Sequence, residues 1–275
     1  MNAAELTAKA NVLGRRTDGS KMLDHAVRVG LVAYGVVHLL IASVAIRLAF
    51  GSEEGSASSD GALSALAENP FGDVLLFVVA AGFFSLVLWQ LIEAFAGHNE
   101  QKGNKLVVKR LGSALKAMLY GSLGYSALKI ALGSGSDGGG TDTMTAKLMS
   151  MPAGQVLVGL VGLAVLGYAG RLIYRGLSEG FKKHLEVEGH TGYDGKAFVM
   201  LGKVGYVSKG AALLVVAGLF LWAAWSHDAD KSGGLDQALH KVLQQPFGAP
   251  MLVAVGIGIA CYGLFCFAWA RHLDR

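Results

Sequence analysis

Eight polar or ionisable side chains lie inside long apolar stretches of the sequence, and they are the first candidates for chemistry. They are Glu93, Gln90, Arg171, Lys116, Lys209, Tyr34, Tyr120 and His38. An ionisable side chain at the centre of a membrane helix costs about 3 kcal/mol, so such residues pair, reach water or serve a function. If the apolar stretches span a membrane, these residues predict an intramembrane polar cluster.

Glu93 is the only carboxylate well inside any of these stretches. One interpretation pairs Glu93 with Arg171 or Lys116 in a polar vestibule that faces the cytoplasm. In the other interpretation, the cationic side chains reach the lipid headgroups and Glu93 pairs with one of these cations. The sequence favours the second interpretation, because long cationic side chains near helix ends commonly reach the interface.

His38 follows Tyr34 by four residues and lies near the middle of its apolar stretch. A histidine at that depth could relay protons, because its ordinary pKa is close to physiological pH. Such a side chain more commonly donates one hydrogen bond to a neighbouring helix. We therefore favour the simpler role for His38.

The sequence contains none of the motifs that indicate catalysis or a metal centre. Cys261 and Cys266 are five residues apart, so they point to different faces of a helix, and no histidine pair stands at ligand spacing. There is no nucleophile elbow, phosphate-binding loop or haem attachment sequence. The sequence therefore predicts no cofactor, no metal site and no enzymatic activity.

The composition indicates that hydrocarbon surrounds much of the chain. Of 275 residues, 53% are apolar and 16% are Asp, Glu, Lys or Arg, whereas soluble domains carry about 25% charged residues. The mean hydropathy is +0.46 and there are 39 glycines, which membrane helices tolerate better than soluble ones do. Disordered, collagen-like and disulfide-rich classes are excluded.

Six apolar segments are long enough to cross a bilayer, which takes about 20 residues per helix. They span roughly 27–50, 72–96, 111–132, 154–177, 204–225 and 249–270. The sequence therefore predicts an all-α polytopic membrane protein with six transmembrane helices.

Lysine and arginine are distributed unequally between the two sides of these segments. The N-terminal segment, the second and fourth connections and the C-terminal tail hold 14, and the other three connections hold 3. The positive-inside rule then places both termini in the cytoplasm. Anionic lipid headgroups at the cytoplasmic face are the expected partners of this charge, and nucleic acid is not expected.

A two-helix unit recurs three times along the chain. Its outer motifs are Pro70-Phe71-Gly72, Pro152-Ala153-Gly154 and Pro246-Phe247-Gly248, each after a short amphipathic turn and with the proline expected at the start of the next helix. Superposing Gly35, Gly121 and Gly210 aligns Tyr34, Tyr120 and Lys209, and it aligns His38 with Gly124 and Leu213. Because each unit has two spans, the copies share one orientation and predict a pseudo-threefold arrangement. One membrane domain then comprises a cytoplasmic segment (1–26) and repeats at 27–97, 98–178 and 179–275.

The recurring glycine-bearing helix, Ala/Leu turn and Pro-Phe-Gly resemble the bacterial membrane family catalogued as domain of unknown function 1206. The resemblance covers about residues 25–271, and Pro152-Ala153-Gly154 departs from its pattern. It implies a six-helix bacterial plasma-membrane protein and no particular reaction.

Three functions are compatible with these features. The one we favour from sequence is a non-enzymatic scaffold or accessory subunit of a membrane assembly, because packing glycines are abundant and no catalytic constellation is seen. The second is a small channel or carrier along the pseudo-threefold axis, which requires Tyr34, Tyr120 and Lys209 to converge. The third is a membrane enzyme or lipid-binding protein that uses Glu93, Arg171 and Lys116.

Overall fold

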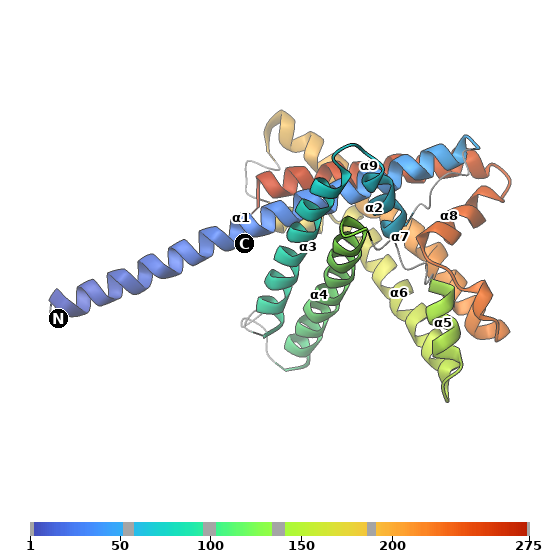
Figure 1. Cartoon of the computed structure of the whole chain (residues 1–275), viewed down its shortest axis with the longest axis horizontal. Helices are drawn as coiled ribbons and strands as arrows, with labels where there is room; N and C mark the ends of the chain where they lie inside the picture. The colour runs from blue at the N-terminus through green and yellow to red at the C-terminus, as the bar shows by residue number, and fades with distance from the viewer. Residues whose placement is uncertain (1–2, 52–57, 96–102, 134–140, 186–190, 274–275) are drawn as a thin grey trace.

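The computed structural model describes residues 3–51, 58–95, 103–133, 141–185 and 191–273, and over these residues the fold is helical (Figure 1). The six long helices of the described ranges are α1 (Ala3–Ala49), α3 (Gly72–Phe95), α4 (Asn104–Ala131), α6 (Gly154–Leu177), α7 (Gly192–Ser226) and α9 (Gly248–Arg271). The shorter ones are α2 (Ser59–Ala67), α5 (Thr141–Met149), α8 (Leu235–Leu243) and the 3₁₀ turns η1 (Gly180–His184) and η3 (Ala229–Lys231). The predicted all-α class is confirmed.

Five of the long helices are apolar and long enough to cross a membrane. The candidate segments are Val27–Ala49, Gly72–Phe95, Gly154–Leu177, Asp194–Ser226 and Gly248–Arg271. The sixth predicted span, 111–132, lies on α4, which is long enough but is not among them. The cations of α4, including Lys116 and Lys129 in its apolar part, lower its hydropathy. The predicted count of six is therefore not confirmed.

The long helices pack in a row that does not follow the chain order. Helix α4 packs on α3, α3 on α1, α1 on α9, α9 on α7, and α7 on α6. The ends of this row, α4 and α6, make no extended contact with each other, and Figure 1 shows them diverging. The middle of the row is α1 and α9, and α7 packs next to α9.

The Pro-x-Gly motifs join each short helix to the next long one. The long helices that follow the motifs, α3, α6 and α9, begin at the motif glycines Gly72, Gly154 and Gly248. These glycines lie two residues after the proline, so the prediction that the proline starts the helix is wrong. A Cβ on any of these glycines would overlap a carbonyl oxygen of the preceding short helix. Glycine is therefore required because the two backbones meet there.

The residue before the motif glycine adopts a left-handed conformation in two copies. Ala153 has φ of 59° and Phe247 has φ of 61°. Residues with a Cβ pay about 1–2 kcal/mol for this conformation. The tight turn that returns the chain into the next long helix is the structural reason for that cost.

Candidate functional site

The centre of the helix row holds a polar cluster built on Lys209 of α7. Its Nζ donates to the Tyr34 hydroxyl at 2.6 Å and lies 2.9 Å from His38 Nε2, both on α1. The same Nζ lies 4.2 Å from the ring centroid of Tyr262 on α9 and 4.7 Å from that of Tyr34. Lys209 therefore joins three helices through two hydrogen bonds and two cation–π contacts.

Both ring nitrogens of His38 are engaged in this cluster. Nδ1 lies 2.8 Å from the backbone carbonyl oxygen of Tyr34, one turn earlier on α1, and can only donate to it. Nε2 is then the acceptor that faces Lys209. A proton path through His38 would end at a backbone carbonyl, so the geometry favours a helix-to-helix hydrogen bond over the relay.

Aromatic rings enclose the cluster. Tyr120 of α4 lies edge-on to Tyr34 with ring centroids 5.5 Å apart, and Phe83 of α3 lies 6.3 Å from Tyr34. On the other side, Tyr262 packs edge-on to Tyr206 at 5.2 Å. The three residues required by the channel hypothesis, Tyr34, Tyr120 and Lys209, therefore converge.

A second group of charges lies between α4 and α6. Lys116 of α4 interacts electrostatically with Arg171 and Arg175 of α6 as like charges and with Glu93 of α3 as an opposite charge. Glu93, Lys116 and Arg171 are thus near enough to interact electrostatically, and the vestibule interpretation stays a prediction. Gln90 is buried one turn away, and its Oε1 has no hydrogen-bond partner among the described residues.

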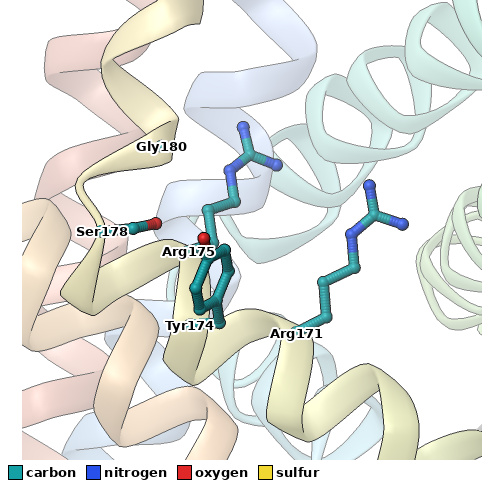
Figure 2. Close-up of a pocket in the computed structure, with 5 residues that line it drawn as sticks. All are labelled: Arg171, Tyr174, Arg175, Ser178 and Gly180. Carbon is teal, nitrogen blue, oxygen red and sulfur yellow. The ribbon is translucent and has the colours of Figure 1, made fainter.

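The two arginines line a pocket of about 230 Å³ at the end of α6, together with Tyr174, Ser178 and Gly180 (Figure 2). Figure 2 shows both guanidinium groups extending from α6 in the same direction. The Arg175 guanidinium carbon lies 5.1 Å from the Tyr206 ring centroid, and its buried Nη2 has no hydrogen-bond partner among the described residues. Among the described residues, the pocket therefore presents two guanidinium groups without a carboxylate in its lining.

Glu179 is close to this pocket in the sequence but is engaged elsewhere. Lys182 hydrogen-bonds its carboxylate and lowers the pKa of the Glu179 carboxyl below its ordinary value. Lys203 lies 3.9 Å from the other carboxylate oxygen. Glu179 therefore has lysine partners of its own.

Sequence reasoning placed Arg175 at the same depth as Arg171 and Lys116, and it missed Tyr262 as a member of these groups. Arg175 follows Arg171 by four residues, so helical spacing alone places both on one face of α6. Nothing in the local sequence distinguishes Tyr262 from other aromatic residues of the apolar helices. Over the described residues, no group of three or more His, Cys, Asp or Glu could hold a metal ion.

Comparison with known proteins gives the register of the repeats. The sequence profile of a protein family described as Domain of Unknown Function (DUF1206) matches residues 29–97, 111–179 and 204–272. Counted from these starts, the motif prolines fall at nearly the same place in each copy. Tyr34 then corresponds to Lys116 and Lys209, and His38 to Tyr120 and Leu213. The superposition of Tyr34 with Tyr120 is therefore wrong by about one helical turn.

The uncharacterized protein YxxB of Bacillus subtilis (strain 168) is 28% identical over 246 residues, which covers 86% of each chain. No solved structure matches this chain. The three matched segments together cover most of the sequence. The chain therefore belongs to the family described as Domain of Unknown Function (DUF1206), of which it carries three tandem copies.

Proposed function

We propose that the chain is a six-span plasma-membrane protein in which α4 is the sixth span and both termini are cytoplasmic. The charge asymmetry of the connections supports this orientation. We also propose that its three repeats are arranged around a pseudo-threefold axis. In support, the first helix of each repeat packs on the second helix of the preceding one: α4 on α3, α7 on α6 and α1 on α9.

Equivalent residues make the equivalent contact across two of these three interfaces. A Cβ on Gly162 would meet Leu221, and one on Gly256 would meet Ile46, which is the same pair one repeat later. In the third interface the corresponding residues, Ala80 and Leu128, belong to one hydrophobic cluster. The polar cluster of Lys209 contacts α1 and α9, and its member Tyr34 also contacts Phe83 of α3 and Tyr120 of α4.

We infer that this central cluster binds a small monoanion, so that the protein is an intramembrane anion-binding protein or carrier. The observation that carries this inference is Lys209 itself. Among the described residues, its hydrogen-bond partners are the neutral Tyr34 and His38, and none of the groups acting on it electrostatically is a carboxylate. A cation in hydrocarbon needs a compensating charge, which a bound anion would supply.

The surroundings of Lys209 favour an anion over a cation as the ligand. Its equivalent in the second repeat is Lys116, and Arg171 and Arg175 stand next to that residue. A ligand that approaches from between α4 and α6 therefore meets positive charge first. Like charges would repel a cation along the same route, while an anion would be concentrated there.

Thermal unfolding of the detergent-solubilised chain in sodium gluconate, chloride, acetate and benzoate tests this function. A ligand that binds only the folded state raises the unfolding midpoint with its concentration. We expect a rise in at least one small anion, loss of the rise in Lys209→Met and its return in Lys209→Arg. Lys129→Met removes a lysine from the last turn of α4 and should keep the rise in unfolding midpoint.

Absence of any anion-dependent rise in the wild-type chain would contradict the proposal. So would an equal response in Lys209→Met. The scaffold role favoured from sequence stays a prediction, and its own test is co-purification of a stable partner after extraction in mild detergent.

A further inference from the structure

In the first and third repeats, small residues allow the two long helices to pack closely against each other. In the first repeat, a Cβ on Gly82 of α3 would lie 2.8 Å from the Ala33 Cβ of α1, and one on Gly30 would overlap Leu86. In the third repeat, Gly258 of α9 meets Ser208 of α7, and a Cβ on Gly205 would lie 2.5 Å from the Tyr262 Cα. These are the same two contacts when the first-helix residues are counted from the start of each repeat and the second-helix residues from the motif proline.

The second repeat lacks both contacts. A Cβ on Gly112 of α4, the equivalent of Gly30 and Gly205, would meet nothing within 4 Å. Leu115 is 53% exposed, whereas the equivalent Ala33 is 4% exposed. Tyr168 of α6 is 45% exposed, whereas its equivalent Leu86 is fully buried. The facing sides of α4 and α6 are therefore open.

The sequence of the second repeat accounts for this opening. The small pair Ala33 and Gly82 becomes the larger pair Leu115 and Ala164, which leaves less room for two backbones to meet. Close helix approach in membranes depends on small residues at such points. The α4 face of Gly112, Leu115 and Leu119 and the α6 face of Ala164 and Tyr168 therefore lack the helix contact of the other repeats, and we call these two faces together the groove.

The groove is apolar along the helices and cationic at one end. Leu115 and Leu119 are exposed on α4, while Lys116, Arg171 and Arg175 stand where α6 approaches its C-terminus. The pocket of Figure 2 lies at this end, with Ser178 as an additional hydroxyl donor. The buried Arg175 Nη2 still lacks an acceptor within the described residues.

We propose that this groove binds one anionic phospholipid of the cytoplasmic leaflet. Its phosphate lies between Arg171 and Arg175, because guanidinium groups pair with phosphate oxygens through charge-assisted hydrogen bonds. An acyl chain lies along the groove and replaces the helix contact that the other two repeats make. An apolar partner helix would fill the groove but supply no negative charge to the arginines, which have no carboxylate in the described pocket lining, and this is why a lipid fits better.

Native mass spectrometry of the chain released from mixed phosphatidylglycerol and phosphatidylcholine micelles tests the proposal. The wild type should retain one phosphatidylglycerol in preference to phosphatidylcholine. Arg171→Gln with Arg175→Gln should lower that preference about tenfold or more, given the energy of charge-assisted hydrogen bonds. Arg271→Gln, which removes an exposed arginine at the end of α9, is the matched control and should retain the lipid.

A second pair of variants tests the groove without touching a charge. Ala164→Trp should fill the groove and reduce lipid retention, while Leu163→Trp should not. Leu163 is 55% exposed and Ile257, its equivalent in the third repeat, is 51% exposed, so both face outward. Lys209→Met should leave lipid retention unchanged, which separates this site from the anion site proposed above.

Three results would overturn the lipid site. One is equal retention of the two lipids by the wild type. Another is equal competition by glycerol phosphate, which has no acyl chain and would indicate a phosphate site alone. The third is a co-purifying membrane protein whose removal opens the groove to lipid, which would make a partner helix the occupant.

Discussion

The first and second repeats share a motif and a helix order, yet their long helices are packed differently. In the first repeat α1 and α3 pack together, whereas in the second α4 and α6 make no extended contact. Val37 on α1 is fully buried, whereas Leu119, its equivalent on α4, is 61% exposed. The difference arises from one small pair, Ala33 with Gly82, which becomes Leu115 with Ala164. Helices of neighbouring repeats pack together in all three cases, α3 with α4, α6 with α7 and α9 with α1. The contact that differs is therefore the one between the two long helices of a single repeat.

The largest expected difference in stability is at the glycine that occupies the second position of each matched segment, which is Gly112 in the second repeat and Gly205 in the third. Gly205→Ala should destabilise the chain by about 2 kcal/mol, because the new Cβ meets the backbone of Tyr262. Gly112→Ala, at the equivalent place in the second repeat, should be neutral or stabilising by up to about 1 kcal/mol, since alanine favours helix and the space is open. Thermal unfolding of both variants measures this, and equal destabilisation would contradict an open second repeat.

Truncation of the equivalent aliphatic residues should give the next largest difference. Val37→Ala removes buried packing on α1 and should cost about 1–2 kcal/mol. Leu119→Ala removes more atoms, but from an exposed side chain, and should change stability by less than about 0.5 kcal/mol. Denaturation in detergent measures both. A larger loss in Leu119→Ala would show that α4 packs against something inside the folded chain.

Tyr34 and Lys116 are the equivalents of Lys209 in the other two repeats, and substituting them should give a smaller difference in stability. Tyr34→Phe removes the hydroxyl that accepts from Lys209 while keeping the ring, so it should cost about 1 kcal/mol. Lys116→Met replaces an exposed cation that has like-charged neighbours, and it should leave stability unchanged or slightly raised. Comparison of the two unfolding midpoints is the measurement. A loss in Lys116→Met as large as that in Tyr34→Phe would mean that Lys116 is part of the central cluster.

Much of this fold follows from sequence patterns, and what does not follow has physical reasons. Apolar length predicts the long helices, and the Pro-x-Gly motifs predict where the short helices end. The register of the repeats is harder, because Gly35, Gly121 and Gly210 look equivalent while the matched segments pair Gly35 with Ala117. A stripe of glycines can shift by one turn without changing its appearance.

The site was predicted in part. Polar residues in apolar helices identify Lys209, Tyr34 and His38 as candidates because each is costly in hydrocarbon. Their mutual hydrogen bonds depend on how α1 and α7 pack, which two sequences 171 residues apart do not reveal. The open groove was not predicted, since Leu115 and Ala164 are ordinary membrane residues until their equivalents in the other repeats are known.

Distances between spin labels at equivalent positions test the central claim most directly. We would compare Val32 with Ala81 in the first repeat and Ala114 with Leu163 in the second, four positions beside the helix contacts and none in the polar cluster. The account predicts a short, narrow distance for the first pair and a longer one for the second in lipid nanodiscs. Two equal short distances would show that the second repeat is closed and would contradict the account.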